Sequence, residues 1–189
     1  MMPVAIAAIE TSSIAQGTVV GDAMVKTAEV ELLEARTLSP GKYWVLIGGE
    51  VGPVRASFRR GVDVAGETLL DSLFIPNIHE SVLQALAGTA PKVDHDALGV
   101  IETMTAAATI VAADQAAKAA HVVVRDIKLA NGLGGKGYFY VSGAVHDVQA
   151  AIEAGRDEAV KRGLLTRSVV VPRLHAQMKA KILGATAER

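Results

Sequence analysis

The sequence of 189 residues contains no cysteine, and this absence removes several classes of site at once. Disulfide bonds, thiolate metal sites, iron–sulfur clusters bound by cysteine and cysteine nucleophiles are all excluded. A chain that needs no disulfide is compatible with a reducing compartment.

The chain also lacks an excess of charge of either sign and a long apolar run. Its 19 basic and 20 acidic side chains give a net charge of −1, so no overall attraction to nucleic acid or to an anionic membrane is expected. No apolar run approaches the roughly 20 residues that cross a bilayer, and residues 1–10 lack the basic region of a signal peptide. We therefore expect a soluble, cytosolic protein without nucleic-acid or membrane partners.

What the chain does contain is an internal repeat. Four motifs occur twice in the same order: residues 8–11 and 100–103, 22–30 and 114–122, 49–54 and 143–148, and 76–79 and 172–175. The order is kept while the spacing drifts slowly, which indicates a tandem duplication with two short insertions. The predicted domains are residues 1–90 and 97–189, joined by a short linker at 91–96.

Each copy is predicted to contain a strand, a helix, two strands, a helix, a strand and a short helix. In the first copy these elements are expected at residues 4–10, 17–28, 30–38, 43–47, 51–65, 69–76 and 80–86. Such an order predicts an α+β fold with a sheet on one side and helices on the other. A copy of about 90 residues supports only a thin core, so burial against a sister copy is expected.

The ordered motifs resemble those of the bacterial microcompartment shell-protein family. In that family a strand ending in Ile-Glu-Thr leads into a helix with the pattern Asp-Ala-x-x-Lys-x-Ala-x-Val. The motif Gly-x-Val-x-x-Val then opens a second helix, and Ile-Pro-x-Pro-His follows. Matching elements lie at residues 9–11, 22–30, 49–54 and 75–79, and again in the second copy. Among tandem members the chain is similar to the propanediol-utilisation type.

The resemblance implies two tandem microcompartment domains, each an antiparallel sheet packed with helices in a variant of the ferredoxin-like arrangement. It implies a structural protein rather than an enzyme: a homotrimer that imitates a hexagonal tile of the microcompartment shell. A central pore for small metabolites is implied, with other shell proteins at the tile edges and encapsulated enzymes as further partners. The pore-lining residues so implied are Ser39, Pro40, Gly41, Lys42, Gly132, Leu133, Gly134, Gly135 and Lys136. The tile-edge residues so implied are Lys26, Lys118, Asn77 and Arg173.

Serine at position 39 stands where some relatives have a cysteine that holds an iron–sulfur cluster on the three-fold axis. A neutral hydroxyl is a poor ligand for such a cluster, so we expect no cofactor, no bound metal and no redox role. Three Ser39 hydroxyls would instead form a polar rim, unless Ser39 is a simple turn residue. Lys42 and Lys136 would attract anionic metabolites if they face the channel, and would be solvated if they point away.

The glycines at 132, 134 and 137 formally match Gly-x-Gly-x-x-Gly, but a strand is predicted to follow them. A dinucleotide site needs a helix N-terminus at that point, so a hairpin loop is the better interpretation. His79 and His175 are repeat equivalents, and their identical placement favours a structural role such as capping of the last helix.

Lys26 and Lys118 each follow an aspartate by four residues, which is the spacing of an exposed helical ion pair. The resemblance instead places them at the tile edge, where they would pack against the next tile. Arg55, Arg59 and Arg60 predict a solvated basic stripe, with binding of an encapsulated enzyme's tail as the alternative.

A second hypothesis is a small-ligand-binding, regulatory or enzymatic α+β protein with its site between the two repeats. The two hypotheses differ in association state. A shell tile requires a closed trimer, whereas a monomer with a saturable small ligand would favour the second hypothesis.

Overall fold

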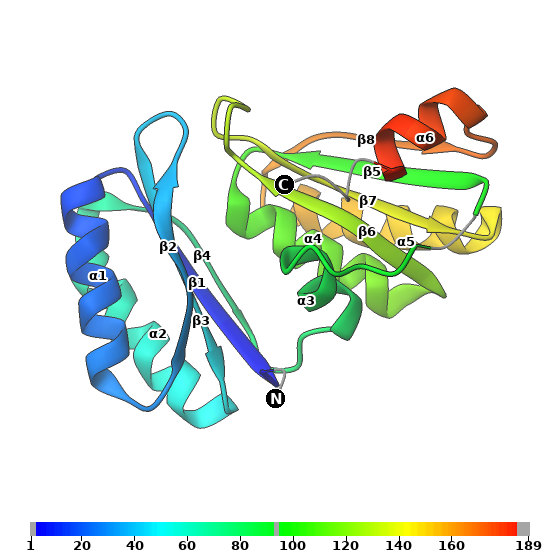
Figure 1. The fold of residues 1–189 in the computed structure, drawn as a ribbon. Coiled ribbons are helices and arrows are strands. Elements are labelled where there is room, and N and C mark those ends of the chain that lie inside the picture. Colours follow the sequence, from blue (N-terminus) through cyan, green and yellow to red (C-terminus); the bar gives the residue numbers. More distant parts are fainter. Residues whose placement is uncertain (1–2, 93–94, 185–189) are drawn as a thin grey trace. The chain divides into compact units, whose positions relative to one another are not determined.

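The computed structural model describes residues 3–92 and 95–184. The first copy contains β1 (Ala5–Thr11), α1 (Ile14–Thr27), β2 (Glu31–Leu38), β3 (Lys42–Gly49), α2 (Val51–Ala65), the 3-10 turn η1 (Gly66–Thr68), β4 (Leu69–Ile75) and α3 (Glu80–Leu86). The second contains β5 (Ala97–Thr103), α4 (Ala106–Ala119), β6 (Val122–Leu129), β7 (Gly137–Gly143), α5 (Val145–Lys161), β8 (Leu165–Val171) and α6 (Ala176–Gly184). The predicted order of elements is confirmed in both copies (Figure 1).

The chain forms two compact units that do not coincide with the two sequence repeats. The first unit comprises residues 3–78 together with the short segments 105–108 and 129–136. The second comprises the other described residues, 79–92, 95–104, 109–128 and 137–184. The first unit therefore takes two segments from the second repeat. Segment 129–136 lies beside the Ser39 turn, and segment 105–108 contacts Glu10 and Asp71.

Each repeat contributes one four-stranded sheet, with the orders β2-β3-β1-β4 and β6-β7-β5-β8. On the central strand of the first sheet, Glu10 lies opposite Trp44 and Asp71. Glu102 occupies the same place in the second sheet and lies opposite Tyr138 and Arg167. A register shift directly follows both glutamates. The duplication is thus preserved at the level of strand register, and these pairings are antiparallel as predicted.

Strand β1 is apolar along most of its length and is buried at every residue. Its alternate residues Ala5, Ala7 and Ile9 belong to the core cluster of the first unit, because side chains two apart in a strand share one face. Helices α1 and α2 both lie on one side of this sheet (Figure 1). The other members of the core cluster are Val20, Met24, Val45, Ile47, Val54 and Ala65.

Helix α2 approaches α1 and the sheet closely at Gly61. A Cβ atom at Gly61 would lie 2.5 Å from Ile9 Cδ1 and 2.7 Å from Met24 Cγ. The equivalent Gly155 in α5 is equally enclosed, since a Cβ there would lie 2.7 Å from the Ala112 carbonyl oxygen. Both copies therefore require glycine where the second helix crosses the core.

The first helix of each copy contacts the third strand at the same place. The glycine and the larger residue, however, exchange places between helix and strand. In the first copy Gly17 of α1 makes room for Tyr43 of β3, since a Cβ at Gly17 would lie 2.5 Å from Tyr43 Cβ. In the second copy the glycine is on the strand, and a Cβ at Gly137 would collide with Thr109 of α4. Each pair keeps one glycine, so the helix can lie close to the sheet in both units.

Capping residues explain where several helices begin. Ser13 Oγ accepts a hydrogen bond from Gln16 N at 3.2 Å, so α1 begins at Ile14, three residues earlier than predicted. The predicted histidine caps are confirmed: His79 Nδ1 accepts from Ser81 N at 3.2 Å. Likewise, His175 Nδ1 accepts from Gln177 N at 3.3 Å.

The segment between the repeats is attached to the second unit at both ends. Arg125 of β6 donates a hydrogen bond from Nη1 to the Pro91 carbonyl, and burial lowers the pKa of its guanidinium from the usual value. Leu174 N donates to the Asp96 carbonyl at 2.8 Å. Within the described part of the chain, no helix is both long and apolar enough to cross a membrane.

Candidate functional site: the two loops between paired strands

The turn between β2 and β3 consists of Ser39, Pro40 and Gly41, and Lys42 is the first residue of β3. Gly41 has a φ of +87°, a conformation that glycine adopts without steric cost. Gly41 N donates to the Leu38 carbonyl at 3.1 Å, which closes the turn. The Pro-Gly turn signal is therefore confirmed, whereas Lys42 belongs to the strand.

The loop between β6 and β7 is closed by its own backbone. Ala130 N donates to the Lys136 carbonyl at 2.9 Å, and Lys136 N donates to the Leu133 carbonyl at 3.2 Å. Gly132, Gly134 and Gly135 all have positive φ, which explains the glycine-rich sequence. Strand β7 follows directly, so the predicted strand is confirmed and the glycine motif has no helix N-terminus to receive a pyrophosphate.

The two loops lie side by side within the first unit. Gly132 N donates to Ser39 Oγ at 3.3 Å. A Cβ atom at Gly135 would lie 3.2 Å from the Ser39 carbonyl oxygen, from Pro40 Cδ and from Lys42 Nζ. The structure thus brings together the two segments that the sequence identified separately, and the contact depends on a bare backbone at position 135.

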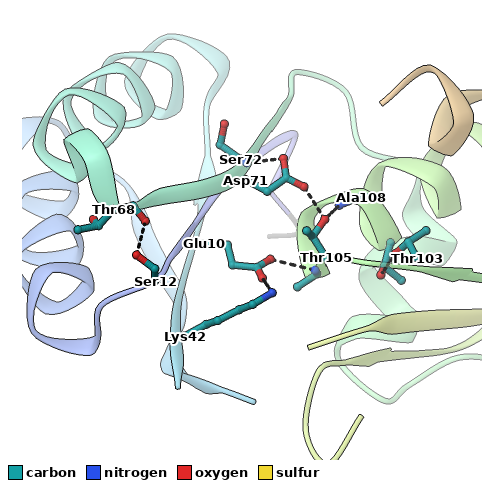
Figure 2. Close-up of polar contacts among 11 residues, drawn as sticks. Glu10, Ser12, Lys42, Thr68, Asp71, Ser72, Thr103, Thr105 and Ala108 are labelled. Atoms are coloured by element: carbon teal, nitrogen blue, oxygen red, sulfur yellow. Dashed lines mark hydrogen bonds and ion pairs between the residues drawn. The ribbon is translucent and has the colours of Figure 1, made fainter. Parts of the chain in front are cut away.

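Lys42, the first residue after the Ser39 turn, is held by a buried carboxylate. Its Nζ lies 2.7 Å from Glu10 Oε1, and the Glu10 side chain is wholly buried whereas that of Lys42 is 18% exposed. The second oxygen, Oε2, accepts from Ala106 N at 3.0 Å. Figure 2 shows Glu10 directed toward Lys42 and toward the segment that begins at Thr105. A buried charge needs such partners, and in the single chain the Lys42 ammonium is paired and mostly buried.

A second polar contact joins the same short segment to β4. Thr105 Oγ1 donates to Asp71 Oδ2 at 2.5 Å and accepts from Ala108 N at 3.1 Å (Figure 2). Thr105 therefore caps the start of α4 and contacts β4 at the same time. Glu10, Asp71 and Thr105 were not among the predicted site residues. The available signal was a single acidic residue at the end of an otherwise apolar strand.

The four predicted edge residues are all exposed in the single chain. Lys26 pairs with Asp22 at 2.7 Å, and both side chains are largely exposed. Lys118 pairs with Asp114 at 2.5 Å, but the Asp114 side chain is only 2% exposed and its Oδ1 accepts from His79 N at 2.8 Å. Both i,i+4 ion pairs form, but only the Lys26–Asp22 pair is the exposed one that the spacing suggests. The two pairs differ in their surroundings, because Asp114 is buried and bonded to His79 N whereas Asp22 is exposed.

The basic stripe on α2 is exposed, as predicted, at Arg55, Arg59 and Arg60. The guanidinium of Arg55 also lies over the Phe74 ring, 5.3 Å from its centroid, which is a cation–π contact. Among the residues that the structure describes, no three or more histidine, aspartate or glutamate side chains are arranged to hold a metal ion.

Comparison with known proteins adds independent findings. Residues 5–78 and 97–174 each match the family model described as the BMC domain. The chain is 44% identical over 177 residues to the bacterial microcompartment shell protein PduT of Citrobacter freundii, covering 94% of this chain and 96% of that protein.

Two solved structures have a similar fold. A microcompartment protein from Desulfitobacterium hafniense matches with a TM-score of 0.84 and 42% identity, covering 93% of this chain and 97% of that one. A fused, permuted hexameric shell protein from the RMM microcompartment matches with a TM-score of 0.58 and 27% identity, covering 82% and 81% of the two chains.

Proposed function

The chain belongs to the BMC-domain family of bacterial microcompartment shell proteins, and from this membership we propose that three copies close into a ring of six domains with a central pore. It is a tandem shell protein of two such domains, and its place is in a microcompartment shell. The role proposed is structural and non-catalytic: the ring is one tile of the shell, and the pore admits small metabolites.

One observation carries this proposal: the Ser39 turn and the glycine loop 132–135 lie side by side in one chain. Equivalent loops of neighbouring domains meet where domains surround a common axis. In a ring with cyclic symmetry, three such pairs of loops would alternate around the axis. They would then line the opening with Ser39, Pro40, Gly41 and the backbone of the second loop.

The groups that the Ser39 turn and the glycines offer are suited to small polar metabolites. Ser39 offers a hydroxyl group, and the glycines offer backbone N–H and C=O groups. Lys42 contributes no free positive charge, because its ammonium is paired with the buried Glu10 carboxylate. We therefore expect Ser39 and the loop backbone to select by size and hydrogen bonding, with no charge selection from Lys42.

The mass of the purified protein tests the proposal directly. Light scattering coupled to size exclusion should give about 59 kDa, three times the chain mass of 19.6 kDa. A monomer of about 20 kDa that binds a small ligand saturably would contradict the ring and favour a ligand-binding protein.

A cysteine scan tests the position of Ser39. The chain has no cysteine, so Ser39→Cys introduces the single thiol per chain. Mild oxidation should then produce disulfide-linked dimers within the trimer. Gly52→Cys, at an exposed position of α2, is the matched control. A trimer in which neither variant forms dimers would place Ser39 away from the axis.

We assign four exposed residues to the tile edge: Lys26, Lys118, Asn77 and Arg173. Exposed lysine and arginine side chains at an edge can contact the backbone carbonyls and carboxylates of an adjacent tile. Asn77 stands where the second copy has Arg173, so the edges from the two copies differ in charge.

A further inference from the structure

We propose that one chain joins the next through Glu102, Arg167 and His175 on one copy and Ser13, Ile14 and Asp22 at the start of α1 on the other. The inference rests on the proposed ring and adds the residues that form its seams. The partner is a second copy of this chain.

Within each unit, hydrogen bonds near α4 already join the two repeats of the chain. In the first unit, Glu10 Oε2 accepts from Ala106 N and Asp71 Oδ2 accepts from Thr105 Oγ1. In the second unit, Asp114 Oδ1 accepts from His79 N. Each contact joins a residue of the first repeat to the start or middle of α4 in the second repeat.

Every residue in these contacts has an equivalent in the other repeat. The strand registers equate Glu10 with Glu102 and Asp71 with Arg167, and the shared helix caps equate His79 with His175. On the other side, Ser13, Ile14 and Asp22 stand at the positions of Thr105, Ala106 and Asp114. Ser13 and Thr105 also share a role, since both cap the helix that follows.

The α1 equivalents are open where the α4 residues are covered. Ala106, Ala107 and Ala108 are fully buried, whereas Ile14, the equivalent of Ala106, is 44% exposed. The Asp22 side chain is 57% exposed, against 2% for Asp114.

Residues of β8 and α6, which would meet α1 of the next chain, are also more exposed than their equivalents in β4 and α3. Leu73 of β4 is 2% exposed, whereas Val169 at its position in β8 is 41% exposed. Val82 of α3 is fully buried, whereas Met178 at its position in α6 is 52% exposed. Apolar side chains left open in this way favour burial against a partner.

The two open surfaces are different from each other, so they form a head-to-tail joint. Such a joint either closes into a ring or continues into a filament. The polar groups at the joint can still form hydrogen bonds, but the donor and the acceptor exchange sides. Arg167 replaces the carboxylate of Asp71, and the Ser13 hydroxyl can accept from a guanidinium where Thr105 donates to a carboxylate. Glu102, which is partly exposed where Glu10 is buried, would face Ile14 N.

Paired cysteines test the seam, because the wild-type chain has no thiol. In Ser13→Cys/Arg167→Cys, a short bismaleimide should join chains into covalent dimers and trimers, with nothing larger, on a denaturing gel. The matched control is Thr105→Cys/Asp71→Cys, whose thiols lie within one chain, so it should remain at the monomer mass.

A second measurement covers the case in which the double variant folds poorly. Chains that carry only Ser13→Cys, mixed and exchanged with chains that carry only Arg167→Cys, should give dimers, and either variant alone should give none. A wild-type trimer with no cross-link in either format would overturn the seam but leave the ring standing. A covalent ladder beyond the trimer would overturn closure, and a wild-type monomer would overturn the proposed function itself.

Discussion

The Glu10 carboxylate lies 2.7 Å from the Lys42 ammonium and has no exposure to solvent. A buried ion pair is costly to break from one side, because the remaining charge stays poorly solvated. We therefore expect this pair to contribute to the stability of the first unit and to neutralise the charge of Lys42.

Glu10→Gln should lower the free energy of unfolding by about 1–3 kcal/mol, since Lys42 loses its counter-charge and stays mostly buried. Asp157→Asn is the matched control, because it removes the carboxylate from the exposed Arg156 pair and should cost about 1 kcal/mol or less. Urea unfolding of both variants provides the comparison. Equal losses would show that the Glu10 pair does not stabilise the first unit.

Gly61→Ala should destabilise the protein by about 1–3 kcal/mol, because the added methyl group would overlap Ile9 and Met24. Gly52→Ala in the same helix has open space around the new Cβ and should be neutral or stabilising by up to about 1 kcal/mol. Thermal unfolding followed by circular dichroism distinguishes them. A Gly61→Ala protein as stable as wild type would contradict the close approach of α2.

Gly135→Ala should lower the melting temperature more than Gly134→Ala does. Both residues have positive φ, so both substitutions introduce backbone strain of roughly 1 kcal/mol. Only the Cβ at 135 would also press against the Ser39 turn, whereas nothing lies within 4 Å of a Cβ at 134. Similar melting temperatures for the two variants would argue against contact between the loops.

Lys26→Ala should leave the trimer intact and weaken the assembly of tiles into flat sheets. Lys26 lies on the exposed side of α1 and makes only a solvated ion pair, so its removal should change stability by about 0.5 kcal/mol or less. Negative-stain microscopy over a concentration series measures sheet formation, and light scattering checks the trimer. Lys161→Ala, a substitution in the last turn of α5, serves as the surface control. Sheets at the wild-type concentration in Lys26→Ala would remove Lys26 from the edge.

Sequence patterns were sufficient for the order of elements and for several local features. Apolar periodicity, the Pro40-Gly41 turn signal and the repeated His79 and His175 caps depend on residues close together in the chain. Such features can be recognised without a three-dimensional model. The end of each element was less certain: α1 begins at Ile14 because Ser13 caps it, and that cap was not recognised.

Features that depend on distant residues could not be predicted in this way. The partner of Lys42 is 32 residues away in sequence, so its side chain could be assigned neither to a channel nor to solvent. The exchange of Gly17 and Tyr43 for Thr109 and Gly137 was equally hidden. Each position taken alone looks like divergence between the copies. Only the packing of helix against strand shows that a larger residue on one element is matched by glycine on the other.

The turn at Ser39 and the glycine loop at 132–135 are chemically unlike, although they come from equivalent hairpins of a duplicated chain. In the proposed ring they would alternate, so the aperture would have three-fold rather than six-fold character. One codon change would then alter three positions of the opening instead of six. Substitutions could accordingly change three loops of the opening at a time, while the three loops from the other hairpin stay the same.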